Sequence, residues 1–169
     1  MKPAWISTLI WIAIALAAMV LAVVGPQESS VMGTVPSLRL SAQRTLALIT
    51  FNKNHRQDAD SWIQGLQLQN DPSINWVRMP VLKDPGDASI RDAMETRVRS
   101  RYPTELEHGN LLPVFTDRAA FIQSAGLKDI DHAYVVVIGR NGDVLARVAG
   151  QFNEAKAQAL RETLTMQGY

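Results

Sequence analysis

The sequence predicts an α/β domain in which a mixed sheet of about five strands carries helices on both faces. Two apolar runs, Thr45–Phe51 and Ile74–Leu82, are each followed by residues with helical spacing. Their strands should therefore be parallel and joined by crossover helices. Two more apolar runs flank an Asn-Gly pair near the carboxyl end and predict an antiparallel hairpin. One sheet with helices on both faces accommodates all of these elements.

The first half of the domain begins with a continuous apolar run at Thr45–Phe51, as in a strand buried on both faces. A helical stripe follows, and Asp58 or Asp60 could cap its start. The stripe consists of Ala59, Trp62, Ile63 and Leu66. In the second strand, Ile74–Leu82, Pro80 indicates that the ladder ends or bulges there. Trp62 and Trp76 are interpreted as core residues.

The middle of the domain contains a second helix, a short strand and a short helix. Ile90, Met94 and Val98 mark the second helix, which Tyr102-Pro103 ends. Pro113 interrupts the apolar run Leu111–Phe115, so an edge position suits this third strand. Asp117 is expected to cap the short helix marked by Phe121, Ile122 and Ala125.

The last part of the domain carries the strongest strand signal, Tyr134–Ile138. The turn Arg140–Asp143 contains Asn141-Gly142, which predicts a type I′ turn, and Val144–Ala149 is the returning strand. Asn153 is expected to cap a closing helix. That helix turns Ala157, Leu160 and Leu164 inward.

An uncharged apolar segment, Ile6–Gly25, precedes the domain and is long enough to span a bilayer core. We interpret residues 1–25 as a membrane anchor or a cleaved signal peptide, 26–44 as a linker, and 45–169 as the domain. Both interpretations place the domain outside the cytoplasmic membrane, in the cell envelope. It is then a single-pass inner-membrane protein, or a periplasmic or secreted one.

Composition excludes several classes of function. The chain has 17 basic and 16 acidic side chains, a balance that argues against nucleic-acid binding. The basic cluster Arg97, Arg99 and Arg101 is either a solvated helix face or a phosphate or lipid site. The chain has no cysteine, which excludes disulfides, thiol catalysis and zinc-thiolate sites. No motif for a cofactor or a catalytic triad stands out.

Three segments carry a resemblance to a known family. The hairpin "VVVIGRNGDVLARVAG" (Val135–Gly150), the preceding "LLPVFTDRAAFIQSAGL" (Leu111–Leu127) and the early strand-loop-helix joint resemble the thioredoxin-like superfamily. The peroxiredoxin-like and membrane-tethered thiol-reductase branch is the more similar one. A weaker likeness, through "NHRQDADSWIQGLQ", is to thioredoxin-like assembly factors of the ATP synthase.

The resemblance also shows what this chain has lost. In that superfamily the loop after the first core strand carries the redox cysteine, at a helix start that favours the thiolate. Residues 54–59 fill this loop here, without sulfur and without a Ser or Thr substitute. The family's cis-proline corresponds to Ala133, preceded by His132, and a trans bond is expected there. The resemblance therefore implies the fold without the redox activity.

The first functional hypothesis is a non-redox binding or assembly module with an envelope protein as partner. Its contact surface would combine the loop after the first strand with the segment before the hairpin. These residues are Asn52, Lys53, Asn54, His55, Arg56, Asp58, Asp131, His132, Ala133 and Tyr134.

The alternative is a protein that binds a small molecule or a metal ion, and an enzyme would also fall under this alternative. It would use His55 and His132 with Asp58 or Asp131 as metal ligands or as acid and base. In a simpler interpretation, both histidines are exposed loop residues without a function. A third hypothesis is a domain in which no functional site has survived. Lys53 and Arg56 could also hold an anion at the start of the helix.

Overall fold

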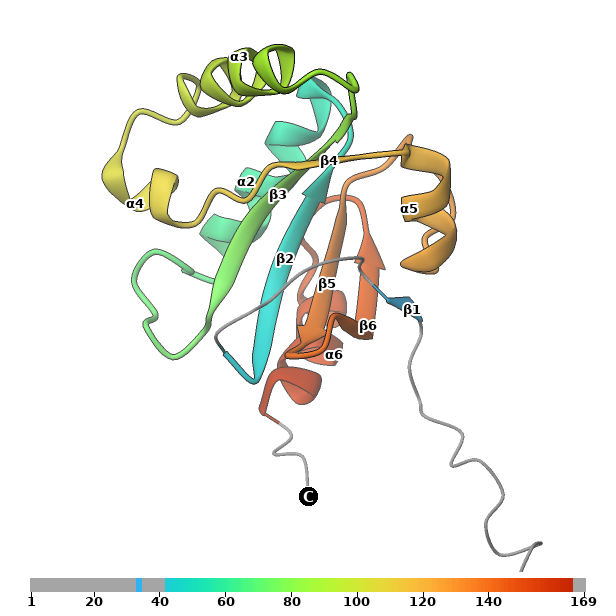
Figure 1. The fold of residues 1–169 in the computed structure, drawn as a ribbon. Coiled ribbons are helices and arrows are strands. Elements are labelled where there is room, and N and C mark those ends of the chain that lie inside the picture. Colours follow the sequence, from blue (N-terminus) through green and yellow to red (C-terminus); the bar gives the residue numbers. More distant parts are fainter. Residues whose placement is uncertain (1–32, 35–41, 166–169) are drawn as a thin grey trace, which may run out of the picture. The chain divides into compact units, whose positions relative to one another are not determined.

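The computed structural model describes residues 33–34 and 42–165, and within them a six-stranded sheet has the order β1-β6-β5-β2-β3-β4 (Figure 1). The strands are β1 (Gly33–Thr34), β2 (Arg44–Thr50), β3 (Trp76–Lys83), β4 (Val114–Thr116), β5 (Tyr134–Gly139) and β6 (Asp143–Ala149). The helices are η1 (Lys53–His55), α2 (Arg56–Gly65), α3 (Ala88–Arg99), α4 (Glu105–Gly109), α5 (Arg118–Ser124) and α6 (Glu154–Thr165).

The sheet is mixed, as the sequence predicted. β2 pairs in parallel with β3 and antiparallel with β5, and β5 pairs antiparallel with β6. A parallel βαβ unit is thus followed by an antiparallel hairpin and a closing helix. This is the thioredoxin-like arrangement that the resemblance implied. The five predicted strands are present, and the two-residue β1 adds an edge next to β6.

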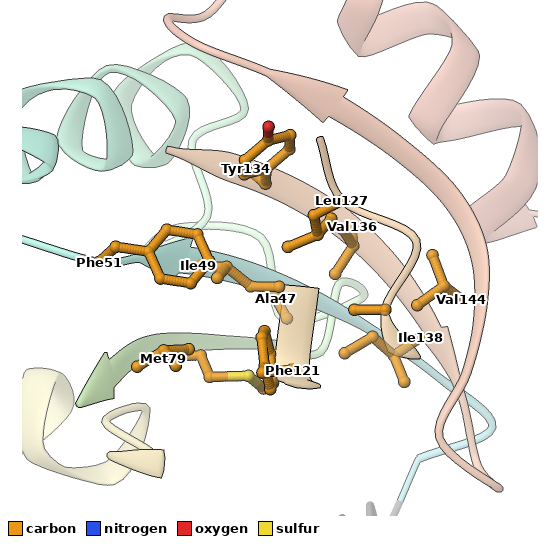
Figure 2. Packing of buried hydrophobic residues seen from close by; sticks show 12 residues of the cluster. Ala47, Ile49, Phe51, Met79, Phe121, Leu127, Tyr134, Val136, Ile138 and Val144 are labelled. Carbon is orange, nitrogen blue, oxygen red and sulfur yellow. The ribbon is translucent and has the colours of Figure 1, made fainter. Parts of the chain in front are cut away.

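Alternating side chains of the central strands build two cores, one on each face of the sheet. Ala47 and Ile49 of β2 join Val136 and Ile138 of β5 in a cluster that contains Phe121 of α5 (Figure 2). The other face packs against α2 and α6. Its members include Leu46, Leu48, Trp62, Trp76, Val135, Val137 and Leu160. Every residue from Thr45 to Thr50 is buried, which explains why the middle of β2, residues 46–49, is uninterrupted apolar sequence. Trp62 and Trp76 are core residues, as predicted.

β3 extends beyond the carboxyl end of β2, and Pro80 marks the step. Thr50 and Pro80 form the last residue pair of the β2–β3 ladder, and β3 then pairs with β4 from Val81 to Lys83. The prediction that the ladder ends at Pro80 is confirmed. α3 lies beyond the ends of the two strands (Figure 1). Val98 and Tyr102, at the end of α3 and just after it, pack with Leu111 and the partly buried Leu82.

Some local predictions were wrong. Neither Asp58 nor Asp60 caps the first helix, because the Asn52 side chain caps the preceding η1 turn instead. Asn141 has no positive φ, so the hairpin turn is not type I′. Gly142, at φ 88°, donates its N–H to Gly139 O, and a register shift follows between Val137 and Ile138. This is a turn that closes on a left-handed glycine, next to a bulge.

Other local predictions hold, and three short elements, β1, η1 and α4, had not been predicted. Asp117 and Asn153 accept N–H groups at the starts of α5 and α6, as expected. β1 lies within the predicted linker 26–44, and α4 was absent from the prediction. Among the described residues no helix is long and apolar enough to cross a membrane. The predicted anchor or signal at 6–25 lies outside those residues.

Candidate functional site

The loop after β2 is held by its own side chains. Asn52 Oδ1 accepts the N–H of Asn54 at 2.9 Å, and the N–H of His55 bonds to Asn52 O at 3.3 Å. These bonds close one turn of 3₁₀ helix that leads into α2 without a break. Lys53, Asn54 and Arg56 therefore project from a defined backbone and are exposed.

His55 connects this loop to the segment before the hairpin. Its side chain is buried, and Nδ1 accepts the N–H of Phe51 at 3.3 Å. We assign the proton to Nε2, which then donates to Asp131 O at 3.1 Å. The Asn52 amide nitrogen lies 3.0 Å from Nε2, but both are donors in this tautomer and form no hydrogen bond with each other. The structure thus brings together the two predicted contact segments, which lie 76 residues apart in the sequence.

The predicted contact surface needs a correction. His55, Ala133 and Tyr134 are buried and cannot make the first contact with a partner, because each is enclosed by the domain itself. Ala133 O accepts the N–H of Gly150 at 2.8 Å. The described chain has no cis peptide bond, so the bond before Ala133 is trans, as expected. The predicted residues that remain exposed are Asn52, Lys53, Asn54, Arg56, Asp131 and His132, with Asp58 half-buried.

Asp129 organises the segment before the hairpin, and sequence reasoning missed it. Its Oδ1 lies 2.8 Å from His132 Nδ1 and accepts hydrogen bonds from Asp131 N and the Tyr134 hydroxyl. The hydrogen bond with His132 holds the pKa of the Asp129 carboxyl below its usual range, with help from the Asp131 N–H. Burial raises the pKa of Tyr134 above its ordinary value.

The two-histidine hypothesis has no support from this geometry. Both ring nitrogens of His55 face partners within the protein, whereas His132 is exposed and bonds to Asp129. Within residues 33–34 and 42–165, no three His, Asp or Glu side chains are grouped so that they could hold a metal ion.

A second cluster, also missed from the sequence, surrounds the start of α2. The guanidinium groups of Arg56 and Arg78 lie 4.9 and 4.8 Å from the ring centroid of Tyr102. Asp60 bonds to Arg78 at 2.7 Å and lies 3.6 Å from Arg56. Arg78 is buried, and its Nη1 has no hydrogen-bond partner in the described part of the chain. A cation inside the apolar run "INWVRMPVL" was the signal that could have revealed it.

A cavity of about 350 Å³ opens beside this cluster, and we call it the α2–α3 pocket. It lies where the parallel strands β2 and β3 end, a common location for ligand sites in α/β sheets. Its lining is apolar with three cationic side chains and no carboxylate. The lining residues are Thr50, Phe51, Asn52, Lys53, Arg56, Pro80, Leu82, Val98, Arg101 and Tyr102.

Comparison with known proteins gives similarity of fold alone. Neither a protein-family model nor a curated protein matches the sequence. Among solved structures, the amino-terminal domain of PilB from Neisseria gonorrhoeae is 17% identical, with 74% of this chain and 79% of that one aligned and a TM-score of 0.45.

Two further solved structures are similar to the same extent. BsSco, described as a member of the Sco family of cytochrome c oxidase assembly proteins, is 14% identical over 74% of this chain and 82% of that one, with a TM-score of 0.47. A protein from Chlorobium tepidum described as the thiol:disulfide interchange protein DsbE is 20% identical over 72% and 80%, with a TM-score of 0.44. The strand order and pairing of the described residues are those of the thioredoxin-like arrangement, and the chain has no cysteine.

Proposed function

We propose that this protein is a non-redox, thioredoxin-like binding or assembly module of the cell envelope. One observation carries the proposal. The loop where the superfamily places its redox thiol is here a fixed turn, built around the buried His55 and tied to Asp131. A preordered loop without a nucleophile favours recognition, because little conformational entropy is lost when a partner binds.

The proposed contact surface consists of the exposed residues on the two joined segments. Lys53, Asn54 and Arg56 come from the loop and the start of α2, and Asp131 and His132 come from the segment before the hairpin. Lys53 has no ion pair within the described residues, so its charge is available to an acidic partner surface. Buried His55 and Tyr134 would hold the geometry without touching the partner.

The location in the envelope is also part of the proposal. It depends on the uncharged segment Ile6–Gly25, which would anchor the protein in the membrane or direct its export. The domain would then meet its partner outside the cytoplasm, and an anchored form would search only the membrane surface.

The experiment is crosslinking in native membranes followed by purification through a tag on Tyr169. We expect a stoichiometric envelope protein that is lost with Lys53→Glu. The matched control is Arg140→Glu, which reverses another exposed charge, at the far end of β5, and should leave capture unchanged. Capture that survives Lys53→Glu, or fails equally in both variants, would contradict the proposed surface.

A second assay tests the absence of redox activity. The purified chain should reduce disulfides and peroxide no faster than buffer, because it has no thiol to oxidise. A reproducible multiple-turnover rate would contradict the proposal.

A further inference from the structure

We infer that the α2–α3 pocket binds a small organic anion with a compact apolar body, about the size of an arylalkyl carboxylate. The inference goes beyond the proposed function because it needs no protein partner. The two sites share Lys53 and Arg56, whereas Arg101 belongs to the pocket alone.

The floor of the pocket is apolar because of how the strands end. β3 continues after β2 has stopped, so Pro80 belongs to the last β2–β3 pair and Leu82 lies beyond it, and both line the pocket. Pro80 has no N–H to offer a ligand. Val98 and Tyr102 also line the pocket and are themselves buried. Such a floor favours an apolar body over a hydrated ion.

The charged side chains that line the pocket are all positive. Lys53, Arg56 and Arg101 line it, and no aspartate or glutamate does. Lys53 and Arg101 form no ion pair among the described residues, whereas Arg91 and Arg99 of α3 pair with Asp84 and Glu95. Unpaired cations beside an apolar floor are complementary to a carboxylate on an apolar body.

Arg56 is positioned before any ligand arrives. The Arg56 guanidinium lies against the ring of Tyr102, and the Asp60 carboxylate lies 3.6 Å from Arg56 Nε. Asp60 thus meets the guanidinium at Nε only. A planar guanidinium held in this way still has N–H groups left for a carboxylate. Because the side chain is already ordered, a ligand that uses it loses less entropy on binding.

The size of the cavity limits the ligand. About 350 Å³ lies at the lower end of the range for small-molecule sites. It accommodates one aromatic ring with a short chain, and it is too small for a folded segment. The anion would lie at the mouth, where exposed Lys53 and Arg101 are found.

The test uses the full chain in lipid nanodiscs and ligand-observed NMR, with empty nanodiscs as the blank. Phenylbutyrate is the probe, phenylbutylamine carries the same body with the opposite charge, and acetate carries the charge alone. We expect saturable binding of phenylbutyrate and at least about tenfold weaker binding of the other two, because charge and apolar body are both needed.

Two charge-reversal variants locate the site. Arg101→Glu should weaken phenylbutyrate binding about tenfold or more, and Arg140→Glu should change it less than about twofold. Both residues are exposed, so both variants should fold. Circular dichroism spectra that match that of the unmodified chain will check this.

Several results would overturn the inference. They are the absence of saturable phenylbutyrate binding, equal binding of phenylbutylamine or acetate, and equal effects of the two variants. Tenfold tighter binding of an amidated Asp-Phe peptide would assign the pocket to a protein segment instead. Arg101 lies outside the proposed contact surface, so Arg101→Glu should leave partner capture normal. A loss of phenylbutyrate binding with normal capture therefore bears on the pocket alone, and a failure of capture bears on the proposed function alone.

Discussion

Replacing His55 with alanine should destabilise the domain far more than replacing His132 with alanine. The His55 ring contributes hydrogen bonds to Phe51 N and Asp131 O, worth about 1 kcal/mol each. It also meets the Phe51 ring edge-on, with centroids 6.4 Å apart, which adds about 1 kcal/mol. The expected loss in the free energy of unfolding is therefore about 3 kcal/mol. His132 is exposed with one partner, so its loss should cost under about 0.5 kcal/mol.

The assay is urea unfolding of both variants, followed by circular dichroism. A loss of about 3 kcal/mol corresponds to a melting temperature about 10 °C lower for a domain of this size. His55→Ala should also release the loop from residue 131, so amide exchange at Asn54 and His55 should accelerate while β5 stays protected. Equal losses in the two variants, or a loss below about 1 kcal/mol for His55→Ala, would refute this account of His55 as the link between the segments.

Three other perturbations follow from the structure. Arg78→Met should change the free energy of unfolding in urea by less than about 1 kcal/mol, because removal of the unpartnered Nη1 offsets the lost ion pair with Asp60. A loss above about 3 kcal/mol would contradict that balance. Gly65→Ala should lower the free energy of unfolding by about 1–3 kcal/mol, because a Cβ there would lie 2.5 Å from the Phe152 ring. Adding Phe152→Leu should restore much of that stability, and a single Gly65→Ala variant without any loss would refute the contact. His132→Ala should raise the pKa of Asp129 toward its ordinary value, as followed by carboxyl-carbon NMR. Asp129 has a lowered pKa when folded, so its contribution is present above the unfolded pKa and is lost as pH falls through the folded one. An unchanged Asp129 titration in the variant would contradict the assigned cause.

Local patterns in the sequence were enough to predict the architecture. The apolar run at residues 45–51 predicted a strand buried on both faces, and Pro80 correctly marked the end of its ladder with β3. These predictions succeeded because residue periodicity and a missing N–H act within a few neighbours. The hairpin was located correctly, but its turn type was not, because the bulge beside it depends on how β5 and β6 pair.

Predictions about the site were only partly right, because burial of polar residues depends on contacts between distant segments. Nothing local distinguishes His55 from His132, yet packing against Asp131 buries one and leaves the other exposed. Arg78 was missed for the same reason, because its partner Asp60 lies in α2. Asp129 was missed although its partners lie within five residues, because the turn before β5 brings them together.

The sequence by itself determined the α/β class, the parallel and antiparallel strand relations and the absence of any thiol, because composition and periodicity encode these directly. Only the tertiary structure decided that Lys53, Arg56 and Arg101 line one pocket, and that His55 fixes the loop beside it. Lys53 and Arg56 come from the joint after β2 and Arg101 follows α3, and their encounter requires β3 to run past β2 and α3 to fold back over its end. That arrangement is a property of the packed sheet, and no single segment specifies it.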